Sequence, residues 1–244
     1  LCNSLHEGII LHTVVRYCVP IAPDIIPCIC HVFWCFLLLF KILSFFCQNL
    51  YITCPFSFFM KFCIVVGTRP EIIKMSPLIR YAEKHSLDYF VIHTGQHYSY
   101  TLDAIMFKDL QLPRPLYSLE VGSGTHGKQT GLMLEKIETI LLQEKPDVVF
   151  VQGDTNSVLA GALAATKLSL KVAHVEAGLR SNDWRMPEEK NRRMVDHVSD
   201  FLFVPTQDSA ALLLKENIDS EKIFVVGNTV VDALYHHRDL AHTS

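Results

Sequence analysis

Short apolar runs alternate with longer amphipathic stretches along the chain from Lys61 onward. Continuous apolar runs are typical of buried strands, and most are followed by a stretch with helical spacing. Because strands that alternate with helices pair in parallel through right-handed crossovers, the pattern predicts an α/β fold. We expect a Rossmann-like, doubly wound and mainly parallel sheet with helices on both faces. The predicted strands cover residues 61–66, 89–94, 147–152, 171–175, 201–204 and 223–226.

Charged residues come soon after three of these predicted strands. Arg69 follows the first strand, Asp154 the third and Glu176 the fourth. In open α/β sheets, ligands bind in the crevice beyond the carboxyl ends of the strands. We therefore expect these three side chains to gather at one edge of the sheet and to face a common ligand.

The segment after the first strand, GTRPEIIK, indicates an anion-binding site. Pro70 suits the first turn of a helix, and Lys74 follows about one turn later. An arginine and a lysine beside a helix N-terminus attract a negatively charged ligand. The alternative is that Arg69 pairs with Glu71 and that Lys74 is solvated.

Further polar candidates lie in the turns and on the helix that Pro187 begins. Glu188, Asn191 and Arg192 are spaced three and four residues apart and therefore share one helical face. A carboxylate, an amide and a guanidinium on one face suit a polar ligand. Glu188 and Glu189 could exchange roles, and both could instead complement the helix dipole.

Three turn residues complete the candidate set. Asp154 could simply cap the helix that follows it, but Gly153 allows a tight turn that would point the carboxylate toward a ligand. His97 lies in the turn after the second strand, and Arg180 lies just beyond the glycine turn after the fourth. His93 and His97 have no third partner, so we predict no metal site.

The segment GSGTHG at 122–127 matches the pattern of a dinucleotide-binding loop. That fingerprint needs a strong preceding strand and an acidic residue at the end of the next strand. The run before the segment, 116–121, is weak as a strand. We therefore predict no bound cofactor, and we interpret the segment as a flexible entry to a helix at 128–143.

Composition changes sharply at Met60. Only four of the 47 charged residues precede it, together with seven of the eight cysteines. The sparse cysteine of the later part fits a reducing cytosol, so we expect a cytoplasmic protein. The formal net charge is −3 and no basic cluster stands out, which argues against a nucleic-acid partner.

Residues 1–59 form an apolar leader that we interpret as upstream sequence without function. Residues 25–47 are long enough to span a bilayer, but Lys41 would be costly there, by about 2.5–3.5 kcal/mol. A membrane segment and a packed N-terminal extension are the alternatives. A membrane partner is therefore expected only if this leader inserts.

Six motifs together resemble the non-hydrolysing UDP-N-acetylglucosamine 2-epimerase family. The resemblance implies a two-domain fold of the glycosyltransferase-B type, of which residues 60–226 match the first domain. Residues 227–244 would begin the passage into a second domain, whose histidine-bearing motif has no counterpart here. The motifs are GTRPEIIKMSPLI (67–79), TGQHY (94–98), GDTNSVLAGALAA (153–165), HVEAGLRS (174–181), PEEKNRR (187–193) and VGNTVVDAL (226–234).

The family's chemistry inverts carbon 2 of the sugar by eliminating UDP and adding it back from the other face. The resemblance implies a UDP-sugar substrate, a homodimer and no cofactor. The implied acid and base candidates are Asp154, Glu176 and Glu188, with the choice among them left open. The implied substrate contacts are Arg69, Lys74, His97, Arg180, Asn191 and Arg192.

Two other classes of function are alternatives. The same fold would suit half of a glycosyltransferase, although a transferase needs fewer clustered carboxylates than the three predicted here. A non-catalytic, membrane-tethered nucleotide-sugar-binding domain is favoured only if the leader inserts into a membrane.

Overall fold

The computed structural model describes residues 60–96 and 100–241. The chain divides into two units, 1–57 and 58–244, and the described residues all belong to the second. In these ranges, no helix is both long enough and apolar enough to cross a bilayer. The hypotheses about the leader, including its span at 25–47, and the prediction for His97 lie outside the described residues.

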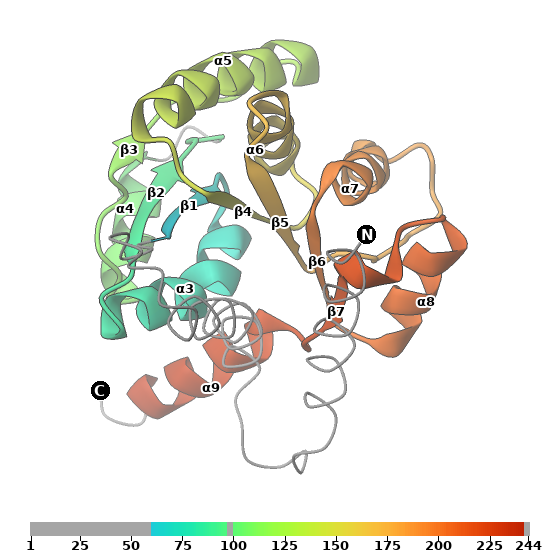
Figure 1. Ribbon diagram of the computed structural model, residues 1–244. Helices are drawn as coiled ribbons and strands as arrows, with labels where there is room; N and C mark the ends of the chain where they lie inside the picture. The colour runs from blue at the N-terminus through green and yellow to red at the C-terminus, as the bar shows by residue number, and fades with distance from the viewer. Residues whose placement is uncertain (1–59, 97–99, 242–244) are drawn as a thin grey trace, which may run out of the picture. The chain divides into compact units, whose positions relative to one another are not determined.

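The described residues form one sheet of seven parallel strands in the order β3-β2-β1-β4-β5-β6-β7 (Figure 1). This order confirms the predicted doubly wound, Rossmann-like fold. β3 is only two residues long, in agreement with the weak strand signal before the GSGTHG segment. The strands are β1 (Lys61–Val66), β2 (Asp88–His93), β3 (Tyr117–Ser118), β4 (Val148–Gln152), β5 (Lys171–Val175), β6 (Phe201–Val204) and β7 (Ile223–Val225).

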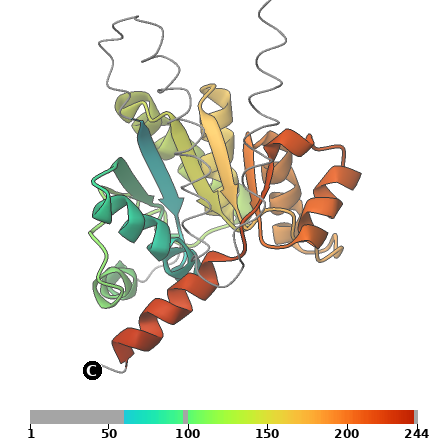
Figure 2. The same cartoon turned by 60° about the horizontal axis from the view of Figure 1, so that its bottom comes forward.

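Helices cover both faces of the sheet. On one face α5, α6 and α7 pack side by side, and on the other α3 packs against α4 and α9 (Figures 1 and 2). The sequence analysis did not predict α4, and it placed the start of α5 two residues late. The helices are α3 (Arg69–Lys84), α4 (Tyr100–Asp109), α5 (His126–Glu144), α6 (Asn156–Lys167), α7 (Pro187–Val198), α8 (Gln207–Lys215) and α9 (Thr229–Ala241), with a 3-10 turn at Ser220–Lys222.

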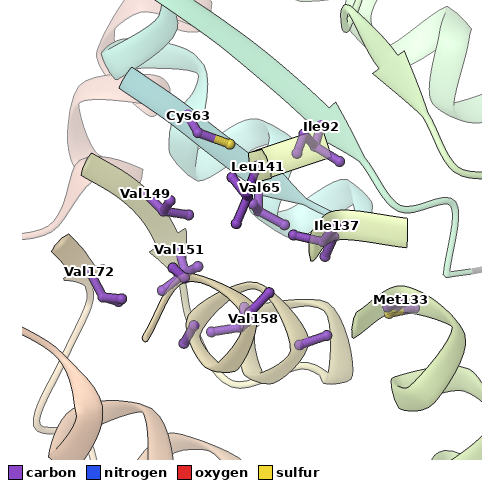
Figure 3. Packing of buried hydrophobic residues seen from close by; sticks show 14 of the residues in the cluster. Cys63, Val65, Ile92, Met133, Ile137, Leu141, Val149, Val151, Val158 and Val172 are labelled. Carbon is purple, nitrogen blue, oxygen red and sulfur yellow. The ribbon is translucent and has the colours of Figure 1, made fainter. Parts of the chain in front are cut away.

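The central strands are apolar on both faces because both faces are covered. Cys63 and Val65 of β1 point toward α5 and α6, where they join Val149 and Val151 of β4 (Figure 3). On the opposite face, the Phe150 ring stacks in parallel with that of Phe203, with 6.5 Å between ring centroids. This double burial explains why these strands read as continuous apolar runs.

The chain reverses its direction of travel across the sheet between β1 and β4. From β1 it proceeds to β2 on one side, and from β4 it proceeds to β5 on the other. Open α/β sheets bind ligands beyond the strand ends at such a switch point. We therefore expect a ligand-binding site in the turns after β1, β4 and β5.

Gly67, which directly follows β1, lies against the start of α6. A β-carbon at this position would lie 1.9 Å from Ser157 Oγ and 2.4 Å from Thr94 Oγ1. These two hydroxyls are buried and hydrogen-bonded to each other at 2.7 Å. The turn after β1 and the first turn of α6 are thus packed with no space for a side chain.

We expect Gly67→Ala to lower the free energy of unfolding by about 1–3 kcal/mol, because the added methyl group must displace buried hydroxyls. Urea denaturation monitored by circular dichroism measures the effect. Gly124→Ala is the matched control, since nothing lies within 4 Å of a β-carbon there. Equal midpoints for the two variants would contradict the packing argument.

Candidate active site

Glu176 connects three elements at the carboxyl edge of the sheet. Lys74 Nζ, from α3, lies 2.8 Å from each oxygen of its carboxylate. Gln152 Nε2, at the end of β4, donates to the same carboxylate at 3.0 Å. The alternative of a solvated Lys74 is therefore wrong for this structure.

The backbone of Glu176 is strained. Its φ angle is +66°, in the left-handed region that non-glycine residues seldom occupy. Such a conformation costs on the order of 1–3 kcal/mol, and strain of this kind is concentrated at functional sites. The contacts to Lys74 and Gln152 hold the carboxylate at the strand end despite this cost.

Asp154 is bound from α7. Arg192 donates to its carboxylate, and Asn191 Nδ2 donates to its backbone carbonyl at 3.0 Å. Thr155, one residue further, caps α6 by accepting a hydrogen bond from the Val158 amide at 3.4 Å. The capping alternative for Asp154 is therefore wrong.

The two ion pairs lie at the carboxyl ends of adjacent strands. Gln152 of β4 is paired in register with Val175 of β5, so Asp154 and Glu176 leave adjacent strands at the same edge. We call Lys74, Asp154, Glu176, Asn191 and Arg192 the strand-end cluster. Side-chain exposure runs from 11% for Glu176 to 31% for Asp154, so the charges of both pairs remain reachable from solvent.

The two neighbouring glutamates of α7 differ in their surroundings. Glu189 is buried and accepts hydrogen bonds from the Ser181 amide and from Arg193 Nε, both at 2.8 Å. Burial opposes its charge, but these bonds hold the pKa of Glu189 below its ordinary value. Glu188 is half-buried and makes no hydrogen bond or ion pair with another described residue. The geometry therefore favours a structural role for Glu189 and leaves Glu188 as the candidate for chemistry.

Arg69 is exposed at the start of α3 and makes no ion pair with any residue in the described ranges. In particular it does not pair with Glu71, so that alternative is also wrong. Its guanidinium is therefore available to a ligand at the start of α3.

Arg180 is buried within a network of ion pairs. Its guanidinium donates to Asp196 at 2.7 Å and to both oxygens of Glu216 at 2.9 and 2.6 Å. Only 1% of its side chain is exposed. We therefore assign Arg180 a structural role, in place of the substrate contact predicted from sequence.

Asp196 is the centre of that network. Besides Arg180, His174 Nδ1 lies 2.7 Å from its carboxylate, and the Gly178 amide donates to it at 3.2 Å. Burial opposes ionisation, but the attraction of His174 and Arg180 keeps the pKa of Asp196 below its ordinary value. The other ring nitrogen of His174 donates to the Gly153 carbonyl at 2.8 Å, so the network also supports the turn that carries Asp154.

Glu71 is a buried acid at the start of α3, and from the sequence it was considered only as a possible partner of Arg69. Its Oε2 accepts hydrogen bonds from the Gly67 and Thr68 amides at 2.5 and 3.3 Å. Burial raises its pKa to about 7, against the opposing effect of hydrogen bonds from Thr155 and the turn. The signal was present in the sequence, because Thr68 and Glu71 have the spacing of a capping box.

The raised pKa of Glu71 predicts that the free energy of unfolding falls as the pH rises. In the unfolded chain Glu71 ionises near pH 4.5, whereas in the folded chain it keeps its proton to about pH 7. The contribution of Glu71 to the free energy of unfolding is therefore complete below pH 4.5 and falls as the pH rises to 7. Above pH 7, Glu71→Gln should therefore raise the free energy of unfolding relative to wild type by up to about 3 kcal/mol. Urea titrations at pH 4.5 and 8 test this. The prediction is contradicted if the difference in stability between Glu71→Gln and wild type favours the variant less at pH 8 than at pH 4.5.

The fold and the strand-end cluster define an open α/β protein with paired carboxylates and cations at its switch point. Within the described ranges, no group of three or more histidine, cysteine, aspartate or glutamate side chains could hold a metal ion. The model of the UDP-N-acetylglucosamine 2-epimerase family matches residues 80–244. The chain belongs to this family.

Known relatives agree with this assignment. The chain is 60% identical over 182 residues to the UDP-N-acetylglucosamine 2-epimerase of Methanocaldococcus jannaschii. The aligned residues cover 75% of this chain and 50% of that relative. It is 46% identical over 177 residues to the UDP-2,3-diacetamido-2,3-dideoxy-D-glucuronate 2-epimerase of Pseudomonas aeruginosa, covering 71% of this chain and 50% of that protein.

A solved structure matches the fold as well. The crystal structure of the M. jannaschii UDP-GlcNAc 2-epimerase in complex with UDP-GlcNAc and UDP superposes with a TM-score of 0.74 at 59% identity. The match covers 76% of this chain and 51% of that chain. The chain thus spans about half the length of the relatives that it matches.

Proposed function

We propose that this chain is the sugar-side domain of a 2-epimerase that interconverts UDP-GlcNAc and UDP-ManNAc. The observation that supports the proposal is the strand-end cluster, whose two carboxylate–cation pairs come from four separate segments at the carboxyl edge of the sheet. Membership of the epimerase family supports the same conclusion. The domain corresponds to residues 60–226, and residues 227–244 lead toward a second domain.

The proposed reaction has demands that these side chains can meet. One carboxylate must take the weakly acidic proton from carbon 2, and an acid or a cation must assist the departing UDP oxygen. Return of a proton to the other face of carbon 2, with re-addition of UDP at carbon 1, completes the inversion. We assign the acid and base roles to Asp154, Glu176 and Glu188.

The cations have a second role in this proposal. Lys74 and Arg192 neutralise Glu176 and Asp154 in the ligand-free chain. A bound diphosphate would compete for both cations and for Arg69, and would free the carboxylates to exchange protons. Asn191 would keep the Asp154 backbone in place, and His97 is retained as a further substrate contact.

The sugar and the assembly are also proposals. We favour N-acetylglucosamine because the relative with 60% identity carries that name, and a modified sugar is the alternative represented by the P. aeruginosa relative. The family resemblance implies a homodimer, which light scattering of a complete protein would test.

Solvent isotope incorporation tests the function. Residues 60–226 would be joined to the second half of the M. jannaschii relative, and the chimera incubated with UDP-GlcNAc in deuterated water. Deuterium at carbon 2 of the sugar, measured by mass spectrometry and NMR, is the expected result. Absence of deuterium from a folded chimera that binds UDP would overturn the proposal, and sugar transfer to an acceptor would support a transferase.

A further inference from the structure

Glu71 occupies the junction between the two turns that flank the switch point. It is 2% exposed, and its Oε2 binds the amides of Gly67 and Thr68 in the turn after β1. The hydroxyl of Thr155, in the turn after β4, faces the same carboxyl group. Its other oxygen, Oε1, has no hydrogen-bond partner of good geometry in the described part of the chain.

The packing at this junction leaves no free space. The backbone of Gly67 lies so close to Ser157 and Thr94 that even a methyl group would not fit. A change at Glu71 therefore acts on both turns at once. One turn leads into Arg69 at the start of α3, and the other carries Asp154.

We propose that Glu71 is a positioning residue that holds the turn leading to Arg69 in register with the turn carrying Asp154. The proposal rests on the proposed function, because Arg69 and Asp154 act on the substrate only within it. Glu71 itself is too deeply buried to touch a ligand, so it acts through the two turns.

The charge of Glu71 adds a pH dependence to this role. Its carboxyl group titrates near neutral pH because of burial, and a negative charge beneath Arg69 opposes binding of an anion. The ion pairs on the elements that flank the junction are Lys74–Glu176, which joins α3 to the turn after β5, and Asp154–Arg192, which joins the turn after β4 to α7. Affinity for a diphosphate should therefore fall as pH rises through about 7.

The first arm of the test needs no ligand. In the full chain, NMR shifts of the Gly67 and Thr68 amides should titrate near pH 7 in wild type and stay constant in Glu71→Gln. In Glu71→Ala, exchange of these amides with solvent should be about tenfold faster, because they lose a buried acceptor. Exchange at the wild-type rate in Glu71→Ala would overturn the positioning role, and shifts that do not titrate in wild type, or that titrate equally in the glutamine variant, would overturn its pH dependence.

The second arm measures the affinity of the chimera for UDP-GlcNAc, whose diphosphate diester does not titrate between pH 6 and 9. Glu71→Gln should match wild type at pH 6 and show no pH dependence, whereas Glu71→Ala should bind about tenfold more weakly at every pH. Glu83→Gln, an exposed carboxyl on the same helix, is the control and should behave as wild type. Wild-type affinity in Glu71→Ala would overturn the positioning role. Absence of binding by wild type would instead overturn the proposed function, and the amide measurements would still decide the role of Glu71.

Discussion

Asp154→Asn and Glu176→Gln should each lower the turnover of the complete chimera by about 10²–10⁴, because an amide cannot accept or return a proton at neutral pH. Both replacements keep the shape of the side chain and an oxygen that can accept from Arg192 or Lys74. The loss should therefore appear in kcat with little change in the circular dichroism spectrum or the unfolding midpoint. Turnover is measured as the rate of UDP-ManNAc formation by NMR.

A charge-matched control separates chemistry from surface electrostatics. Glu135→Gln removes an exposed carboxylate on α5 and should leave turnover unchanged. Glu188→Gln should also reduce turnover, whereas Glu189→Gln should act chiefly on stability because Glu189 is buried among hydrogen bonds. Unchanged turnover in both Asp154→Asn and Glu176→Gln would remove these residues from the mechanism.

Asp196→Ala should lower the free energy of unfolding by about 3–5 kcal/mol, the usual cost of removing one partner of a buried ion pair. The change would leave the Arg180 guanidinium and the His174 ring without their shared carboxylate in a site closed to water. Urea denaturation of the full chain at pH 7 measures the loss. Because His174 also binds the Gly153 carbonyl, the variant should disturb the turn that carries Asp154.

The pH dependence of this effect has a definite sign. The pKa of Asp196 is lower in the folded chain than its ordinary value of 3.8, so its contribution is present above pH 3.8 and is lost as pH falls through the folded value. The difference between wild type and Asp196→Ala should therefore be largest near neutrality and shrink in strong acid. Asp183→Ala, which breaks an exposed pair with Arg185, serves as the control and should leave the midpoint unchanged. A similar shift in both variants would refute the buried-network account.

The strands could be predicted because burial on both faces leaves a continuous apolar signature. The predicted bounds of β1, β5 and β6 agree with the structure. β3 and α4 could not be predicted in the same way, since a two-residue edge strand has almost no pattern and α4 has no distinct apolar face. Their position depends on the sheet edge and not on local sequence.

Charged residues at the strand ends could be named from the sequence, but their pairings could not. Residues at strand ends could be named because parallel strands all place their carboxyl ends at one edge. The partner of each charge is set by folding: Lys74 meets a carboxylate 102 positions later, and Arg180 is neutralised by Glu216. The burial of Glu71 and the left-handed backbone of Glu176 likewise arise from packing between segments that are distant in sequence.

The pairing of β1 with β4 also governs when the molecule can acquire its site during synthesis. Lys61 and Asp147, at the start of these neighbouring strands, are 86 residues apart in the chain. Domains form progressively as the ribosome extends the chain, and distant pairings are slow to close. A nascent chain that ended before Asp147 would leave the backbone N–H and C=O groups along one edge of β1 without their partners on β4. That interval lasts until β4 has emerged, and during it the unpaired strand edge is open to pairing with other chains.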